Sequence, residues 1–550
     1  MTIPDLILHN ARVLTMNNDT PRAEAVAVAG NRILAVGSDA DILAVAGADT
    51  RIVDAQGATL LPGFVESHLH LFAGAYGQTL LQLGGTTGFD AMKAAVEVFA
   101  ASKPTEGLLF AQGADYEILG VGTRLDRHVL DAMCPDRPLA VMMFDFHTLF
   151  ANTAALTAAG LLRGRDLPAG NEVVMGLDGL ATGELREKFA LLPVLDLRTS
   201  GGREMLGMSG IEPPTPPTAQ EWRDDVEVLK TGLRYLASHG ITSAHNMDGN
   251  RHLLVLLRNV EAEGGLLARV EVPFHLTREM PLSELERARA MARDFTGDRL
   301  RCTRVKIFVD GVIESGTAAL LEDYADRPGH RGEPIFDADS FRAAAIEVDR
   351  RGMGITVHAI GDAAVRITLD GYEAAQAANG KRDSRHRIEH IELIAPSDIP
   401  RFAELGVIAS MQPLHAATKP GPATESIGPD RAHLNSAWRA LVEAGADFAF
   451  SSDWPIVPVP PLISIQAAMT RQPWAKDTPD QRLTLQQVLE AYTWRGAYAG
   501  YMEAKTGRIR PGMLADLVLL SGDIEAVTHD QIASLFPVLT VCDGRVTHEA

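Results

Sequence analysis

The chain has 550 residues, of which 46% are hydrophobic and 22% charged, a composition that excludes a disordered, collagen-like or coiled-coil protein. This length exceeds one compact core of usual size, so we expect one large domain and a smaller one. The 71 acidic and 51 basic residues give a formal net charge of −20, which excludes nucleic acid as a partner because a polyanion would be repelled.

The cysteines and the N-terminal segment bear on the cellular compartment. Cys134, Cys302 and Cys542 lie far apart without a C-x-x-C motif, which excludes a disulfide framework or a thiolate zinc cluster. No apolar run approaches the roughly 18–20 residues that span a bilayer, and the start MTIPDLILHN lacks the basic region of a signal peptide. We therefore expect a cytoplasmic protein with a small-molecule substrate and no membrane partner; a homodimer stays open.

Both ends of the chain have the pattern of short strands. Residues 1–57 alternate apolar and polar side chains around turn signals such as His-Asn and Gly-Asn. Residues 506–550 contain ADLVLLSGD and FPVLTVCDGRVTHEA, with an Asp-Gly turn. We expect the two ends to form one composite β-sandwich domain, with two unrelated flanking hairpins as the alternative.

Residues 58–505 alternate strand-like and helix-like segments. The expected strands are Leu60–His68, Ile241–His245, Val270–His275, Val305–Asp310, Ile355–His358, Arg387–His390, Val407–Gln412 and Phe448–Asp453. Eight β/α units predict an α/β fold of the TIM-like (β/α)₈ barrel type, whose working face lies at the carboxyl ends of the strands. Most of these strands end on His or Asp, which a packed core would not need.

One gap between strands is much longer than a crossover requires. We interpret residues of about 75–220 as a large insertion after the first strand, lying over the active-site mouth and supplying pocket walls. A partly hydrophobic substrate is expected from its apolar residues Phe144, Phe146, Leu149 and Phe150.

The first motif with metal-binding chemistry is His68-Leu69-His70. Side chains two apart on extended chain point the same way, so both imidazoles can face one metal ion. Lys306 stands in the otherwise apolar run VKIFVDG, where a lone buried lysine is costly. It either pairs with Asp310, extends to solvent, or takes up CO₂ as a carbamate that bridges two metals.

Three further residues stand at the ends of later strands. His358 in ITVHAIGD and His390 in HRIEHIE would each, alone, be ordinary core or surface histidines. Asp453 in FAFSSDWP could be a turn residue. At the carboxyl end of one barrel, however, they complete a metal site in which Asp453 is the general base.

The chain contains, in this order, the motifs PGFVESHLH, VKIFVDG, VHAIGD, RIEHIE and SSDWP. This ordered set resembles the amidohydrolase superfamily, and more narrowly its amidohydrolase-3 (YtcJ-like) branch, which includes N-substituted formamide deformylase. The resemblance covers almost the entire chain, including the C-terminal TGRIRPGMLADLVLL. One difference is Glu66, where many relatives have Asp. The resemblance implies these metal ligands: His68, His70, Lys306, His358, His390 and Asp453. By this resemblance, His68 and His70 bind the more buried ion, and His358 and His390 bind the second ion. Carboxylated Lys306 bridges the two ions.

These residues predict a metal-dependent hydrolase of a non-peptide C–N bond (amide, N-formyl or carbamate) in a small, partly hydrophobic molecule. Metal-activated hydroxide would attack, with Asp453 as general acid and base. The cofactor is expected to be two Zn²⁺ ions, or one if Lys306 is unmodified, and Mn²⁺, Co²⁺ or Fe²⁺ would fit the same nitrogen and oxygen ligands. The alternatives are ester hydrolysis, isomerisation or decarboxylation at the same site, or a non-catalytic metal-stabilised protein.

Six polar residues are candidates for substrate binding because they lie in the insertion or at strand ends, although each could be structural. They are His147, Glu184, His245, His275, Gln412 and His415.

Overall fold

The computed structural model describes residues 2–103, 107–120, 122–143, 148–167, 171–416, 421–473 and 478–550. The chain forms two compact units. The first comprises the segments up to Gly74, Gly207–Glu212 and Gly232–Ala550; the second comprises Ala75–Leu206 and Pro213–Thr231. Within the described ranges, no helix combines the length and the apolar character needed to cross a membrane.

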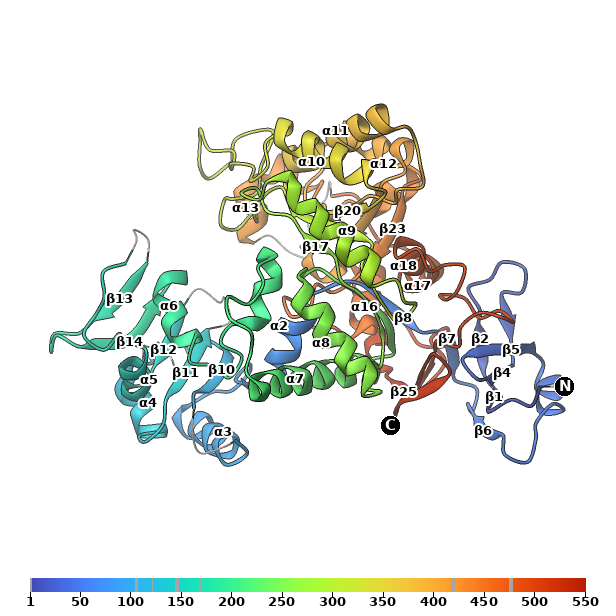
Figure 1. Cartoon of the computed structure of the whole chain (residues 1–550), viewed down its shortest axis with the longest axis horizontal. Coiled ribbons are helices and arrows are strands. Elements are labelled where there is room, and N and C mark those ends of the chain that lie inside the picture. Colours follow the sequence, from blue (N-terminus) through green and yellow to red (C-terminus); the bar gives the residue numbers. More distant parts are fainter. Residues whose placement is uncertain are drawn as a thin grey trace. The chain divides into compact units, whose positions relative to one another are not determined.

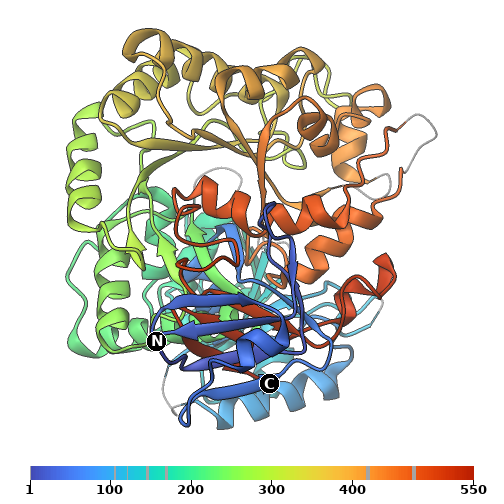
Figure 2. The same cartoon turned by 90° about the vertical axis from the view of Figure 1, so that its right-hand side faces the viewer.

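In the first unit, strands from both ends of the chain lie together (Figure 2). One sheet has the order β5-β4-β1-β6 and the other the order β26-β25-β24-β7-β2-β3. The strands are β1 (Leu6–His9), β2 (Arg12–Leu14), β3 (Arg22–Ala23), β4 (Ala25–Ala29), β5 (Arg32–Gly37), β6 (Arg51–Asp54), β7 (Thr59–Pro62), β24 (Leu517–Leu520), β25 (Pro537–Cys542) and β26 (Arg545–Glu549). A buried apolar cluster joins them, so each end supplies part of the other's core.

The rest of the first unit is a barrel-like α/β fold, as the sequence predicts. Parallel pairing runs from β8 to β15 and β16, and from β17 through β19, β20, β21 and β22 to β23. A parallel bridge between Leu69 and Trp454 links the first strand to the segment after the last. The strands are β8 (Phe64–Leu69), β15 (Ile241–Asn246), β16 (Arg269–Glu271), β17 (Phe274–His275), β18 (Leu300–Arg301), β19 (Arg304–Phe308), β20 (Gly354–Ala359), β21 (Arg387–His390), β22 (Ile408–Met411) and β23 (Asp447–Phe450).

Helices follow the barrel strands and lie outside them, as the yellow and orange segments of Figure 2 show. The long helices are amphipathic, and α10 and α11 bury apolar residues at three- and four-residue spacing. The helices are α8 (Arg251–Ala262), α9 (Leu285–Asp294), α10 (Ala338–Arg350), α11 (Asp362–Asn379), α12 (Ile399–Leu405), α15 (Trp438–Glu443), α16 (Pro461–Thr470), α17 (Leu485–Ala491) and α18 (Trp494–Ala499). The helix α7 (Ala219–Ser238) begins in the second unit and ends in the first.

Three expected strands differ from the structure by more than two residues at an end or are divided in two. The run Leu60–His68 is two strands, because β7 pairs with β24 in the terminal sheet and only β8 enters the barrel. The run Val270–His275 is divided at Pro273, which has no backbone N–H to donate; β16 pairs with β15, and β17 with β19. The last strand ends at Phe450, so Asp453 lies in the following loop.

The second unit has a mixed sheet with the order β13-β14-β12-β11-β10-β9. Leu139 and Val141 of β11 pack in one apolar cluster, while Ala140 and Met142 pack in another. Because successive strand residues point to opposite faces, the sheet is covered on both sides. The elements are β9 (Leu81–Gln82), β10 (Leu109–Ala114), β11 (Leu139–Met143), β12 (Thr148–Ala151), β13 (Glu172–Met175), β14 (Ala181–Arg186), α3 (Phe89–Ala101), α4 (Arg127–Met133), α5 (Thr153–Ala158) and α6 (Lys188–Leu195), all but β9 labelled in Figure 1.

Candidate metal centre

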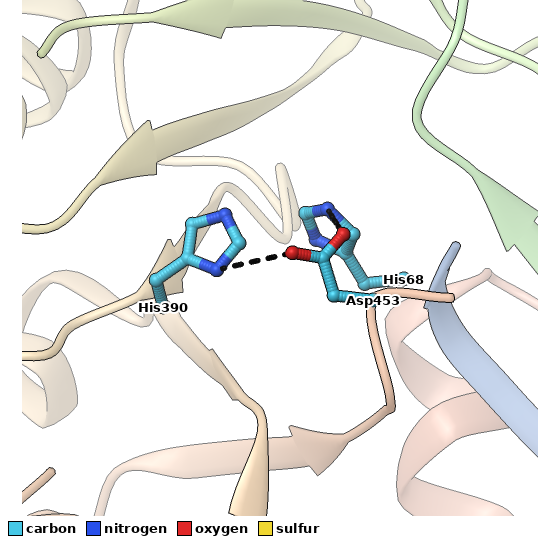
Figure 3. Close-up of side chains that lie close together, drawn as sticks. All are labelled: His68, His390 and Asp453. Carbon is cyan, nitrogen blue, oxygen red and sulfur yellow. Dashed lines mark ion pairs between the residues drawn. The ribbon is translucent and has the colours of Figure 1, made fainter. Parts of the chain in front are cut away.

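Histidines from two barrel strands converge on Asp453 (Figure 3). His68 lies in β8, His390 ends β21, and each of these residues and Asp453 offers one ligand atom within 4.8 Å of the others. His70 joins them, because Asp453 Oδ1 is 3.2 Å from His68 Nε2 and 3.1 Å from His70 Nε2. The H-x-H spacing thus places both imidazoles on the same side of the extended chain.

The loop that carries Asp453 is tied to the first barrel strand. The backbone N–H of Asp453 donates to the carbonyl of His68 at 2.9 Å, and Asp453 has a positive φ of 69°. Glu66 accepts hydrogen bonds from the Ser452 backbone N–H at 2.6 Å and from its hydroxyl at 3.0 Å. Burial raises the pKa of Glu66 to about 8. The two hydrogen bonds from Ser452 to Glu66 fix the loop beside Asp453.

Carboxylates orient the two histidines of the H-x-H motif. His68 Nδ1 lies 2.8 Å from a Glu389 oxygen, and His70 Nδ1 lies 2.7 Å from Asp248 Oδ1. A carboxylate at Nδ1 requires the proton there, which leaves each Nε2 lone pair for a metal ion. Both Nε2 atoms are the ones that face Asp453.

The other two predicted histidines are oriented by neutral groups. His390 Nδ1 is 2.9 Å from the side-chain oxygen of Gln412, which leaves Nε2 free for a ligand. His358, in β20, is turned the other way, with its Nε2 3.1 Å from the carbonyl of Gly311. Their ring centroids are 4.5 Å apart, and those of His68 and His390 are 4.8 Å apart. The structure thus brings all four predicted histidines together.

Lys306 lies fully buried in β19, as expected for the bridging position. Its Nζ has no hydrogen-bond partner among the described residues and lies 4.6 Å from the centroid of the Phe308 ring. Burial lowers the pKa of Lys306 to about 8, against the opposing effects of Glu389 and Asp453. A buried lysine is costly without a partner, and an amine of lowered pKa reacts more readily with CO₂, so its surroundings suit a carbamate.

The electrostatics of the cluster also suit a cation. Burial raises the pKa of Asp453, but His68 and His70 outweigh this and hold it well below its usual range. Burial lowers the pKa of His358 to about 3, and that of His390 lies well below its ordinary value for the same reason. Burial lowers the pKa of His70, but Asp248 and Asp453 outweigh it and raise the pKa to about 10, so a metal ion would displace a proton from this ring. An ionised carboxylate beside the neutral rings of His358 and His390 is a donor set for a divalent metal ion.

An unsatisfied atom supports this fit. Asp453 Oδ1 is buried and accepts no hydrogen bond from the part of the chain that the structure describes, although two imidazole nitrogens lie within 3.2 Å. Buried polar atoms without a partner are rare unless a ligand completes them. The nitrogen and oxygen donors of this cluster therefore fit Zn²⁺, Mn²⁺, Co²⁺ or Fe²⁺.

Two of the expected substrate-binding residues lie beside this cluster. Gln412 bonds His390 and donates to the Ser451 hydroxyl at 2.9 Å, so it supports a ligand. His415 Nε2 is 3.8 Å from Asp453 Oδ2, and its Nδ1 is 3.6 Å from Glu392. Of these two, His415 stays a candidate for substrate binding.

The other four have different surroundings. His245 Nδ1 faces Arg387 at 3.0 Å, and His275 Nδ1 lies 3.3 Å from the Gly207 carbonyl. Glu184 belongs to the second unit, where it pairs with Arg186 at 2.7 Å and lines a cavity of about 220 Å³. His147 lies outside the described residues.

The sequence analysis did not identify Glu389, Asp248 and Arg387. Arg387 donates to both oxygens of Glu389 at 2.9 and 3.0 Å, to the Ser67 carbonyl at 2.6 Å and to the Ser410 hydroxyl at 2.8 Å. The available signal was the pair of charges in RIEH, because charged residues two apart on a buried strand need partners inside the barrel.

Comparisons with known proteins identify the family of the chain. The sequence matches the amidohydrolase family over residues 51–548. The YtcJ protein of Bacillus subtilis is 29% identical over 99% of both chains, and N-substituted formamide deformylase of Arthrobacter pascens is 25% identical over 99% of this chain and 98% of its own. A crystal structure of an uncharacterized metal-dependent hydrolase from Pyrococcus furiosus superposes with a TM-score of 0.73 at 26% identity, covering 94% of this chain and 98% of the other. The chain belongs to the amidohydrolase family and is a metal-dependent hydrolase of carbon–nitrogen bonds other than peptide bonds.

Proposed function

We propose that the protein hydrolyses an amide, N-formyl or carbamate bond of a small, partly hydrophobic molecule. The observation that carries this proposal is the convergence of His68, His70 and Asp453, together with the buried Lys306, whose Nζ has no hydrogen-bond partner among the described residues. A purely structural metal site is closed and needs no extra base or empty position. The similarity to N-substituted formamide deformylase supports an N-formyl or related amide as the substrate class.

The metal-holding residues fall into two sets around a shared lysine. His68, His70 and Asp453 would hold one divalent ion, His358 and His390 a second, and carboxylated Lys306 would bridge them. When bound, such an ion lowers the pKa of water from 15.7 to about 7 and polarises a carbonyl oxygen. Zn²⁺ is the proposed metal, since its preferred ligands are the nitrogen and oxygen donors present here.

Asp453 is the proposed general acid and base. Its Oδ2 is the outer carboxylate oxygen, 4.0 Å from His390 Nδ1 and 3.8 Å from His415 Nε2. There it would accept a proton from the attacking water and return it to the departing nitrogen. Its ionised state, held by the two nearest histidines, is the one that a base requires.

The sequence-based prediction of a partly hydrophobic substrate relies on the apolar residues of the insertion. Leu149 is fully buried and Phe150 is 4% exposed, and both belong to apolar clusters of the second unit. Their apolar character is therefore explained by core packing and does not by itself indicate a hydrophobic substrate. The likeness to N-substituted formamide deformylase supports an N-substituted amide, and the hydrophobic character of the substituent is a part of the proposal that the substrate panel tests.

The test combines metal analysis with a substrate panel. Purified protein should contain Zn²⁺ or another divalent metal and should release amine from N-alkyl or N-aryl formamides faster than it cleaves matched esters. Removal of the metal with a chelator should abolish turnover, and added Zn²⁺ should restore it. Faster cleavage of the esters, or amide hydrolysis that survives metal removal, would refute the proposal.

A further inference from the structure

The four histidines differ in the group that orients each ring. Both histidines of the H-x-H motif face a carboxylate, Glu389 for His68 at 2.8 Å and Asp248 for His70 at 2.7 Å. Neither later histidine has a carboxylate that close. The groups within hydrogen-bond distance of their rings are a backbone carbonyl for His358 at 3.1 Å and an amide oxygen for His390 at 2.9 Å. The nearest carboxylate oxygens are farther away, Asp310 Oδ1 at 3.8 Å from His358 Nε2 and Asp453 Oδ2 at 4.0 Å from His390 Nδ1. The centre therefore has two halves with histidine ligands in both. Carboxylates orient the histidines of one half, His68 and His70, and neutral oxygens orient those of the other half, His358 and His390.

The two carboxylates are not equivalent. The charge of Glu389 is balanced by Arg387, which donates to both of its oxygens, and Thr356 donates to it as well. Asp248 is 1% exposed, and its Oδ2 has no hydrogen-bond partner among the described residues. The charge of Asp248 is thus directed at the ring of His70.

This difference has a direct consequence for ligand strength. A carboxylate on the far ring nitrogen makes an imidazole a better donor, and removal of such a partner costs about 10–100-fold in metal affinity. A neutral carbonyl or amide oxygen polarises the ring less. Asp453 adds a further negative charge on the side of His68 and His70, whereas a carbamate on Lys306 would be shared by both halves.

From this arrangement we infer that the two halves of the centre have unequal metal affinity. The half built from His68, His70 and Asp453 fills first and tightly, and the half built from His358 and His390 fills second and weakly. At limiting metal the protein would hold a single ion in the first half. This inference rests on the proposed metal centre but not on any substrate.

The experiment is a titration of the chelator-treated full-length protein with Zn²⁺ by isothermal calorimetry, repeated with Co²⁺ by visible absorption. Two steps should appear, with dissociation constants that differ by at least about tenfold. Asp248→Asn, which keeps the side-chain shape, should weaken the first step by about 10–100-fold and leave the second unchanged. Gln412→Leu should weaken only the second. Glu392→Gln is the matched control, because Glu392 contacts His415 and no predicted ligand, and it should change neither step.

The possible outcomes separate this inference from the proposed function. Two equal steps, or an Asp248→Asn variant with unchanged affinities, would overturn the inequality while leaving the metal centre in place. If only one equivalent binds to the wild type, it should be lost in His70→Ala and retained in His358→Ala, and the reverse would overturn the assignment. Absence of binding by either metal would overturn the proposed function itself. The wild-type isotherm decides the case even if a variant does not fold.

Discussion

Replacement of Asp453 by Asn separates proton transfer from metal binding. Asn keeps the size of the side chain and one oxygen that can face His68 and His70, both within 3.2 Å of Asp453 Oδ1 in the wild type. It cannot accept and return a proton. The loop should keep its conformation, because the backbone bond to the His68 carbonyl and the bonds from Ser452 to Glu66 do not involve the changed side chain.

The expected loss of rate follows from the missing proton transfer alone. Removal of a general acid or base typically costs about 10²–10⁴ in rate, which corresponds to roughly 2.7–5.4 kcal/mol of activation free energy. Here one carboxylate would act in both directions, so kcat should fall at least about 100-fold, with KM little changed. Four histidines and Lys306 remain, so most of the metal should stay bound.

The assay measures amine release from an N-aryl formamide by the metal-replete variant, together with metal content by mass spectrometry. Asp398→Asn is the control, since Asp398 is also a buried carboxylate but pairs with Arg366 and Arg401. The control should lose stability and keep its kcat. Near-normal turnover by Asp453→Asn with a full metal complement would refute the assignment of Asp453 as the base.

The remaining predictions address the lysine, the terminal sheets and the response to pH. Lys306→Ala should lose about one metal equivalent and most activity, both measured on purified protein, and short-chain carboxylates should partly restore them; full activity with unchanged metal would support a single-metal centre. Deletion of residues 506–550 removes β24, β25 and β26, so the truncated protein should be insoluble by sedimentation, whereas a soluble, active product would contradict the composite domain. Burial raises the pKa of Asp349, but contacts with His386 and other donors outweigh it and hold the pKa well below the ordinary 3.8. A carboxyl group whose pKa is lower in the folded than in the unfolded protein stabilises the fold fully only above its unfolded-state pKa. Asp349→Asn should therefore lower Tm at pH 7, and the difference in Tm from the wild type should shrink below about pH 4. A difference that stays constant with pH would contradict this role.

The barrel could be predicted from the sequence because its strands are short buried runs separated by amphipathic helices. What could not be predicted is which partner each strand finds. Thr59–Pro62 and Phe64–Leu69 form one apolar run, and only the pairing with β24 shows that the chain changes sheets between them. The break at Pro273 was visible in the sequence, but its effect on pairing depends on the neighbouring strands.

The metal-ligand residues could be predicted because their residue types and positions are unusual for a packed core. H-x-H, a lysine in an apolar strand and His or Asp at strand ends are unusual enough to select the ligands. The orienting groups are less distinctive: Asp248 is the one acidic residue of a short loop after a strand, and the only signal for Glu389 is its spacing of two from Arg387 on a buried strand. Their roles depend on contacts with His70 and His68 across 178 and 321 residues of sequence.

The barrel interior explains why these supports exist at all. Barrel cores are usually filled by branched aliphatic side chains. Here residues two apart on single strands are buried and polar: Glu66 and His68 on β8, Arg387 and Glu389 on β21. Each buried charge must be paired or bonded to be tolerated. Arg387 satisfies this by donating to both oxygens of Glu389, and Oε2 of the same carboxylate orients His68. The same period-two alternation that builds the barrel therefore lines its interior with groups that must be paired for folding and that also aim the metal ligands.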